Sequence, residues 1–389
     1  MDKSPTFTIL LPAKGRPLLV RDALLSVLEQ TFQDFEIIVS NNGADSAVRD
    51  AVSDLINDPR VRYLEQPSVL SMPAHWEHIS LFATGLYLTV LPDRSVLKQG
   101  ALAKIAEMHH SGEDETAIIT WPWDLYFEEH EFLLPYAESS KNIKVLESVA
   151  LALDSLRART SYPSELPLGL NSSVSADVIN KIRKLSGRAF SPLTPDFSFA
   201  YNCLMCHPKI THICEALTIS QGGGLSNGGK AYATDAGDYV EKLNIKKPIF
   251  YSPIRTLFVE NLIAEDFFAA CHRFNRQDVL QQFDMANLYQ KCWMELNVKR
   301  MAGILAPRVI AELEQSLEAA LANEVASVSS YVNAHRKQLH MRAFRGNMRL
   351  LLKKLLFDRR VKWLRPLIFR LCGGKFFRSV LVASGHRSG

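Results

Sequence analysis

Apolar runs and amphipathic stretches alternate along roughly the first hundred residues of the chain. The apolar runs are short, contain many β-branched and aromatic residues and end at turn residues, a pattern typical of β-strands. The predicted strands are Thr6–Leu11, Phe35–Ser40, Val61–Leu64 and Leu86–Leu91. Apolar residues at helical spacing predict helices over about 17–30, 46–56 and 73–84. Such alternation favours an α/β fold in which a mostly parallel sheet is flanked by helices.

Polar segments follow three of the four predicted strands. They are residues 12–16, 41–45 and 92–95. Because parallel strands joined by crossovers end at the same edge of a sheet, we expect these segments to lie close together, where open α/β sheets bind ligands. They supply hydrogen-bond donors, cations and a carboxylate. The sequence therefore predicts a nucleotide-binding site at this edge.

Four segments of this region occur in a recognisable order. They are Thr8–Pro12, Arg16-Pro17, Ser26–Thr31 and Phe35–Val39. Together they resemble the opening of a family-2 glycosyltransferase of the GT-A fold. The similarity runs from about residue 6 to about residue 120, with a looser similarity to about residue 240.

The resemblance implies a Rossmann-like GT-A domain over residues 1–260. Residues 1–120 would form its nucleotide-sugar-binding half and residues 121–260 its acceptor-binding half. It also implies a nucleotide-sugar donor, usually a divalent cation such as Mg²⁺ or Mn²⁺, and transfer with inversion at the anomeric carbon. Pro12 and Arg16 would then line the donor pocket.

The chain departs from the family pattern in two places. Where the family carries an Asp after the second strand, this chain has Asn41 and Asn42, whose amides can bond a uracil edge or ribose hydroxyls without adding charge. In place of the Asp-x-Asp metal motif the chain reads Asp93-Arg94-Ser95. Only Asp93 offers the anionic oxygen that a divalent cation prefers, so the use of a metal stays open. Arg94 either pairs with the donor diphosphate or is a solvated turn residue.

Inversion requires a base, because the acceptor hydroxyl loses its proton as the new bond forms. The family places an acidic residue at the start of a helix downstream of the metal motif, and Asp196 fits that description. The alternative is that Pro195 and Asp196 only start a helix, where both residue types are favoured. Asp235 and Asp238 are reserve candidates, with a surface loop as the alternative.

Aromatic residues after the apolar run Ala117–Thr120 are candidates for acceptor binding. Trp121 and Trp123 are suited to stacking on sugar rings, and buried packing is the alternative for both. The glycine-rich run 221–229 is either a loop that closes over the donor or a flexible linker.

Charge is distributed very unevenly. Residues 336–389 hold 15 Lys or Arg and one acidic residue, so this tail carries +14, whereas the rest of the chain carries −10 of the total of +4. Basic residues alternate there with Leu, Ile, Phe and Trp363, which favours amphipathic helices on an anionic membrane surface. Packing on the acidic main body and a nucleic-acid patch are alternatives, and we do not expect a nucleic-acid partner.

Residues 261–335 are predicted to form a helical connector between the domain and the tail. Ile310–Tyr331 is Glu- and Ala-rich with apolar residues at helical spacing, suited to self-association or to packing within the domain. The sequence shows no signal-peptide pattern and no run near the ~20 apolar residues that span a bilayer, and its six cysteines fit a reducing compartment. We therefore expect a cytoplasmic protein attached peripherally to the inner face of the membrane.

These observations predict an inverting glycosyltransferase that moves a sugar from a nucleotide donor to a hydroxyl of a glycan or lipid-linked acceptor in surface or extracellular polysaccharide synthesis. Asp196 would be the base, Asp93 would contact ribose or a metal, and Arg94 would face the diphosphate. The alternative, favoured by the reduced metal motif, is a catalytically silent relative that acts as a membrane-associated binding or scaffold protein.

Overall fold

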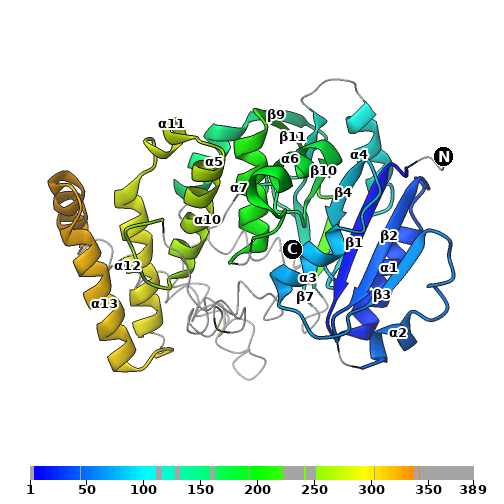
Figure 1. The fold of residues 1–389 in the computed structure, drawn as a ribbon, viewed down its shortest axis with the longest axis horizontal. Coiled ribbons are helices and arrows are strands. Elements are labelled where there is room, and N and C mark those ends of the chain that lie inside the picture. Colours follow the sequence, from blue (N-terminus) through cyan, green and yellow to red (C-terminus); the bar gives the residue numbers. More distant parts are fainter. Residues whose placement is uncertain are drawn as a thin grey trace, which may run out of the picture.

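An eight-stranded sheet flanked by helices forms the centre of the protein (Figure 1). The computed structural model describes residues 4–43, 45–110, 116–127, 132–157, 163–191, 193–221, 241, 251–301, 303–336 and 341. The strand order is β3-β2-β1-β4-β10-β6-β11-β9. These strands are β1 (Phe7–Ala13), β2 (Phe35–Asn41), β3 (Val61–Glu65), β4 (Tyr87–Val90), β6 (Ile118–Thr120), β9 (Ile143–Glu147), β10 (Ser172–Ser175) and β11 (Lys209–Ile213).

A second, four-stranded sheet has the order β5-β12-β7-β8. Its strands are β5 (Ser95–Leu97), β7 (Trp123–Phe127), β8 (Phe132–Leu134) and β12 (Thr218–Gln221). The helices are α1 (Pro17–Leu28), α2 (Ala47–Ala51), α3 (Met72–Ser80), α4 (Ala101–His110), α5 (Ser148–Arg157), α6 (Ala176–Ser186), α7 (Pro195–Cys206), α10 (Val259–Arg273), α11 (Gln277–Leu280), α12 (Met285–Met301) and α13 (Pro307–Ala322). A last helix covers 326–336.

The predicted α/β fold class is confirmed, with its flanking helices and a C-terminal set of helices. β1 pairs in parallel with both β2 and β4, and β2 pairs in parallel with β3. The second half of the sheet is more mixed than expected, because β10 runs antiparallel to its neighbours β4 and β6. The parallel half nevertheless brings the ends of β1, β2 and β4 to one edge of the sheet.

Alternate residues of the central strand β1 face two different cores. Phe7, Ile9 and Leu11 belong to the core beneath α1 and α4, and all three are fully buried. Leu10 points the other way, into the core beneath α3, α6 and α7. This two-residue period is the geometry of a strand that is covered on both faces, and it explains why the strand reads as a continuous apolar run.

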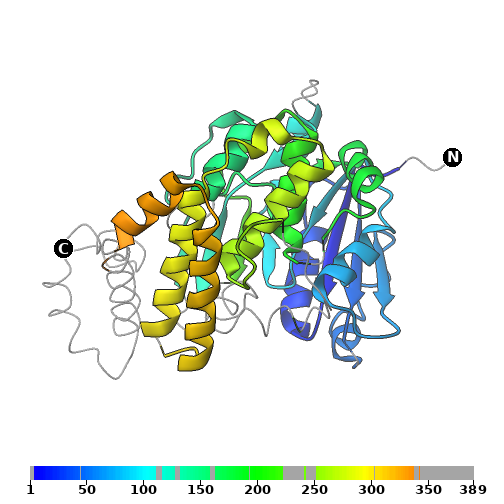
Figure 2. The same ribbon diagram turned by 60° about the vertical axis from the view of Figure 1, so that its left-hand side comes forward.

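The C-terminal helices continue the second of these cores. α10 is buried on almost every side and packs against α7 and α12, and α13 packs on α12. Figure 2 shows α12 and α13 side by side, with the last helix across one end of the pair. The division of the chain into a domain up to residue 260 and a connector stays a prediction.

The stretch Ile310–Tyr331, whose apolar residues have helical spacing, belongs to two helices in the structure. α13 ends at Ala322, and the chain turns before the last helix begins at residue 326. The turn lets Val332, which is fully buried, pack into the same core as Leu317. Apolar spacing alone does not reveal such a break, because both helices keep their own helical period.

Within the described ranges, every helix is too short or too polar to cross a membrane. The basic tail 336–389 lies outside the described residues, apart from Arg336 and Met341. The predicted amphipathic helices of that tail therefore stay a prediction.

Replacing Gly85 with Ala is expected to destabilise the fold by about 1–3 kcal/mol, as overpacking does. A Cβ at this position would lie 2.5 Å from the backbone nitrogen of Thr8 and 2.7 Å from the carbonyl carbon of Phe7, so β1 and β4 would have to separate. Thermal denaturation measures the loss. Gly187→Ala is the control, since Gly187 has φ +73° but nothing within 4 Å of the added Cβ. An equal loss in both variants would contradict the close-approach argument.

Candidate active site

Three polar strand ends meet at one edge of the sheet, as the sequence predicts. The amide of Asn42 donates to the Ala13 carbonyl at 2.8 Å, which joins the end of β2 to the end of β1. The amide of Leu91 donates to the Leu10 carbonyl at 2.8 Å, so the segment after β4 continues along β1. The predicted residues Pro12, Arg16, Asn41, Asn42, Asp93 and Arg94 therefore all lie along this edge.

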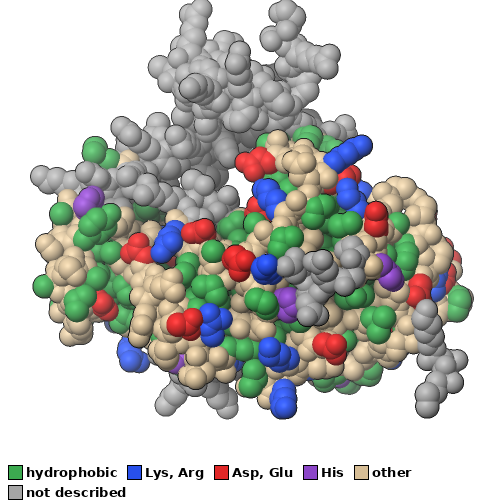
Figure 3. Space-filling view, turned by 90° about the horizontal axis from the view of Figure 1, so that it is seen from above, with side chains coloured by type: hydrophobic (Ala, Val, Ile, Leu, Met, Phe, Trp, Pro, Cys, Tyr) green, Lys and Arg blue, Asp and Glu red, His purple; other side chains and the backbone are tan. Residues whose placement is uncertain are grey.

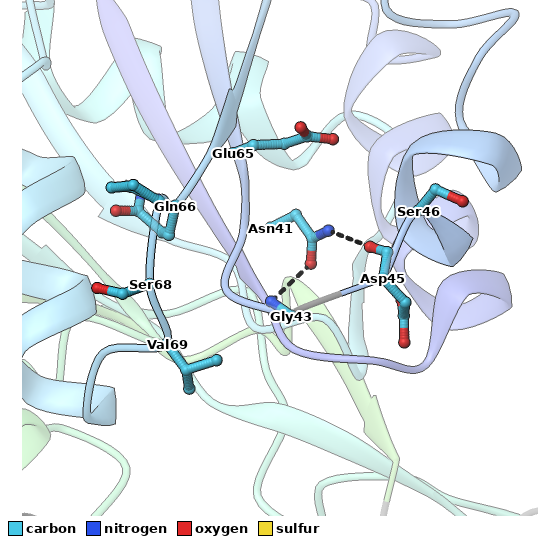
Figure 4. A pocket seen from close by; sticks show the side chains of 9 residues that line it. Asn41, Gly43, Asp45, Ser46, Glu65, Gln66, Ser68 and Val69 are labelled. Carbon is cyan, nitrogen blue, oxygen red and sulfur yellow. Dashed lines mark hydrogen bonds between the residues drawn. The ribbon is translucent and has the colours of Figure 1, made fainter.

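A cavity of about 370 Å³ opens beside the end of β2 (Figure 4). Its volume is in the range that suits part of a small-molecule ligand. Its walls come from the segment after β2 and the segment after β3. The lining residues are Asn41, Gly43, Asp45, Ser46, Glu65, Gln66, Pro67, Ser68 and Val69.

Sequence reasoning missed the wall contributed by the end of β3. Polar residues were expected after three strands only, yet Glu65, Gln66 and Ser68 follow β3 and line the cavity. The signal was present, because Gln66-Pro67 directly follows an apolar run and marks a strand end at the same edge.

Asn41 and Asn42 hold the walls of the cavity in place. The side-chain amide of Asn41 donates to the Asp45 carbonyl at 3.0 Å and accepts from the Gly43 amide at 2.9 Å, as the dashed lines in Figure 4 show. Asn42 bonds Leu70 twice, accepting from its amide at 2.8 Å and donating to its carbonyl at 2.9 Å. Both side chains are buried, so they shape the cavity by fixing its loops. Direct contact with a base stays a prediction.

Arg16 and Asp93 form an ion pair at the ends of β1 and β4. The Nη1 atom of Arg16 lies 3.1 Å from Oδ1 of Asp93. Gly15 and Arg16 both adopt positive φ, +69° and +55°, and this conformation is costly for a residue with a side chain. Burial raises the pKa of Asp93, while the charges of Arg16 and Arg94 oppose that shift. The left-handed turn therefore brings a guanidinium to a buried carboxyl group.

Arg94 is anchored rather than solvated, which answers the alternative left open by the sequence. One of its Nη atoms donates to the Gln221 carbonyl at 2.9 Å, and the Gln221 amide donates to the Arg94 carbonyl at 2.8 Å. Burial lowers the pKa of Arg94, and the negative charges of Asp93 and Asp196 favour its charged form. The start of the glycine-rich run is thus tied to Arg94, and the run beyond residue 221 lies outside the described residues.

Asp196 is the second residue of α7, after Pro195. Burial raises the pKa of this carboxyl group, while hydrogen bonds from the backbone, including the Phe197 amide at 3.0 Å, and the charge of Arg94 lower it. The structure therefore brings Asp196 into the electrostatic environment of Arg94, although about a hundred residues separate them in the chain. The reserve candidates Asp235 and Asp238 lie outside the described residues.

The two tryptophans predicted for acceptor binding differ in exposure. Trp121 is 1 % exposed and belongs to the core beneath α1 and α4, so its ring offers no open face to a sugar. This is the packing alternative that the sequence left open. Trp123 begins β7 and is partly exposed, and its role in acceptor binding stays a prediction.

The residues at the position of the metal motif supply one carboxylate, that of Asp93. Ser95 is buried in β5, and its hydroxyl lies 2.7 Å from the hydroxyl of Ser220 in β12. Asp93, the one carboxylate of the motif, already pairs with Arg16. Among the residues described, no cluster of three or more His, Cys, Asp or Glu side chains is placed to hold a metal ion. Arg16 and Arg94, whose charges act on Asp93, are suited to pair with a diphosphate.

Residues 8–138 match the family described as glycosyl transferase family 2. A curated relative, the GalNAc(5)-diNAcBac-PP-undecaprenol beta-1,3-glucosyltransferase of Campylobacter jejuni, is 28% identical over 110 residues. That alignment covers 28% of this chain and 36% of the relative, so the chain matches little more than a third of the relative's length.

Two solved structures of other proteins can be aligned with most of this chain, with TM-scores below 0.5. S. aureus TarS 1-349 in complex with UDP-GlcNAc has a TM-score of 0.49 at 12% identity, covering 86% of this chain and 92% of that chain. The mannosyltransferase PcManGT of Pyrobaculum calidifontis, in complex with GDP-Man and Mn²⁺, has a TM-score of 0.41 at 12% identity, covering 89% and 88%.

The family match spans β1 to β4 and the strand-end residues up to Arg94, whereas Asp196 lies outside it. Over residues 8–138 this match confirms the resemblance to family-2 glycosyltransferases that is read from the sequence.

Proposed function

We propose that the protein is an inverting glycosyltransferase that moves a sugar from a nucleotide-sugar donor to a hydroxyl of a glycan or lipid-linked acceptor in surface or extracellular polysaccharide synthesis. The observation that carries the proposal is that the Asp196 carboxyl group interacts electrostatically with the half-buried guanidinium of Arg94, which is anchored after β4 by the Gln221 carbonyl. This reaction needs a carboxylate that accepts the acceptor proton and a cation that stabilises the leaving diphosphate.

In the proposed reaction the nucleoside occupies the cavity lined by Asn41 and Glu65, and the diphosphate lies toward Arg94. The acceptor oxygen attacks the anomeric carbon on the side opposite the diphosphate. The bond between that carbon and the phosphate oxygen breaks, and its electron pair leaves with the nucleoside diphosphate. The acceptor proton passes to the carboxylate of Asp196. One displacement inverts the configuration at the anomeric carbon.

The raised pKa of Asp196 suits this role. A carboxylate whose pKa lies above its usual range is a better proton acceptor than a solvated one, and burial supplies that shift here. The positive charge of Arg94 opposes the shift and favours the ionised form of the carboxyl group. The same guanidinium is suited to stabilise the negative charge that develops on the leaving diphosphate.

Membrane attachment through the tail 336–389 is part of the proposal. The tail carries +14, and each basic residue near an anionic surface contributes about 1 kcal/mol. In Figure 3 acidic and basic side chains are interspersed over the described part of one face, which therefore offers the tail no continuous acidic surface. The curated relative is named for an undecaprenol-linked glycan, and a lipid-linked acceptor would likewise be found at a membrane.

The direct test is to incubate the full-length protein with a panel of nucleotide sugars and with membrane extract as acceptor. We expect one donor to release its nucleoside diphosphate, and the new linkage to have the opposite anomeric configuration from the donor. Release with retained configuration would contradict the single displacement. Binding of a nucleotide sugar without release from any donor would instead support the silent binding protein.

A further inference from the structure

Helix α7 begins in an unusual way. Thr194 is the residue before its first turn, a position where a threonine hydroxyl commonly accepts a hydrogen bond from the helix backbone. Here the Thr194 side chain makes no such cap. Its hydroxyl donates instead to Oδ2 of Asp266 on α10, and its backbone amide donates to the same oxygen at 3.2 Å. A carboxyl group 72 residues away therefore holds the start of α7.

The first turn of α7 also carries Asp196. The distance along the chain from Thr194 to Asp196 is two residues, so a shift of Thr194 moves the Asp196 carboxyl group with it. Asp266 accepts hydrogen bonds from both the amide and the hydroxyl of Thr194, and these two bonds fix the position and the rotation of this turn. A misplacement of about 1 Å in a reacting group can cost about 100-fold in rate.

The carboxyl groups of Asp266 and Asp196 also interact electrostatically. Asp266 is 1 % exposed, and burial raises its pKa to about 7, while the bonds from Thr194 and the charge of Arg273 oppose the shift. The charge of Asp196 raises it further. Around Asp266 the titratable or charged groups are Asp196 and Tyr201 on α7 and Arg273 on its own helix. Coulomb interactions are mutual, so the ionisation of Asp266 also makes Asp196 more basic.

We propose that Asp266 is the positioning residue for Asp196, holding the first turn of α7 through Thr194 and coupling its own ionisation to that of the base. The proposal rests on the proposed function, in which Asp196 accepts the acceptor proton. Asp266 touches no reacting atom in this scheme. It acts through the backbone and through its charge.

The neighbouring residue Glu265 provides a matched control. It lies on the same helix, is equally buried and has a pKa raised by burial to about 7. Its oxygens accept from the amides of Tyr251 at 2.6 Å and Ser252 at 2.8 Å, so it holds a different segment. An effect that comes only from titrating a buried acid on α10 would be the same at both positions.

The activity test follows nucleoside diphosphate release against pH in the wild type, Asp266→Asn, Asp266→Ala and Glu265→Gln. We expect the wild-type kcat/KM to rise as pH passes about 7, and Asp266→Asn to lose this step. Asp266→Ala should lower kcat by about 10- to 100-fold with little change in the KM for the donor. Glu265→Gln should keep the step. A step that persists in Asp266→Asn would overturn the coupling.

A stability test works without any turnover. The pKa of Asp266 is higher in the folded than in the unfolded protein, so its contribution to stability is full at low pH and is lost as pH rises through about 7. The Tm gain of Asp266→Asn over the wild type should therefore grow as pH rises from about 4 to about 7 and level off above that. This gain in Tm should be smaller in an Asp196→Asn background, because that background lacks the repulsion between the carboxylates of Asp196 and Asp266. An equal gain in Tm in both backgrounds would refute the coupling between Asp266 and Asp196. If the stability results held but no nucleoside diphosphate were released, only the proposed function would be contradicted.

Discussion

Asp196→Asn is expected to slow sugar transfer by about 100- to 10,000-fold, which is the usual contribution of a positioned general base. Asparagine keeps the size of the side chain and its place in the first turn of α7, but it cannot accept the acceptor proton. The loss should appear in kcat, while the KM for the nucleotide sugar stays within about twofold, because Asp196 acts on the acceptor side of the reaction.

The control must remove a helix-capping charge without removing a base. Asp177 is suited to this, because it is the second residue of α6, as Asp196 is of α7, and it is exposed. Each Asp→Asn change costs a helix about 0.3–1 kcal/mol of favourable interaction with its N-terminus. If Asp177→Asn and Asp196→Asn reduced activity equally, Asp196 would be no more than a helix-capping residue.

Arg94→Ala is expected to lower kcat by about 100- to 1,000-fold, the range seen when a preorganised charge-stabilising group is removed. The guanidinium is held by the Gln221 carbonyl and is attracted by Asp93 and Asp196, so it is fixed before the donor binds. Arg94→Lys should retain part of the rate, since it keeps the charge and loses the planar pairing with phosphate.

Assays of diphosphate release with a chelator and with added Mn²⁺ test whether Arg94 or a metal ion neutralises the diphosphate charge. Because the motif offers one carboxylate already paired with Arg16, we expect chelation of divalent cations to leave wild-type release within about twofold. Added Mn²⁺ should fail to rescue Arg94→Ala. Arg21→Ala is the control for loss of an exposed arginine, since Arg21 pairs with Asp54 on the surface. Strict dependence of the wild type on Mn²⁺ would show that a cation performs the role assigned to Arg94.

The parallel half of the fold could be predicted from the sequence because its information is local. Strands such as Phe35–Asn41 contain a short apolar run, here Ile37–Val39, and polar residues follow that run at the end of the strand. Asn41, Asp93 and Arg94 could therefore be assigned to one edge before their side-chain contacts were known. The antiparallel insertion of β10 could not be predicted, because Ser172–Ser175 has little apolar character and owes its place to pairing with β4 and β6.

The contacts that tune the site were beyond sequence reasoning for a different reason. Asp266 lies in a helix whose pattern indicates only burial, and its link to Thr194 joins residues 72 positions apart. Glu295, equally hidden from sequence reasoning, accepts hydrogen bonds from the amides of Val259 and Glu260 at the start of α10 and pairs with the buried Lys299 at 2.9 Å. The residues next to a buried acidic residue in the sequence do not indicate which group it will bond in the fold.

The two helix starts held by acids from later helices limit how this protein can be rearranged. α12 secures the start of α10 through Glu295, and α10 secures the start of α7 through Asp266. Recombination between relatives therefore cannot exchange the C-terminal helices without losing these hydrogen bonds. A chimera that took these helices from another protein would need an acid at position 266 to keep α7 in place, so this part of the chain and the first turn of α7 are expected to evolve as one unit.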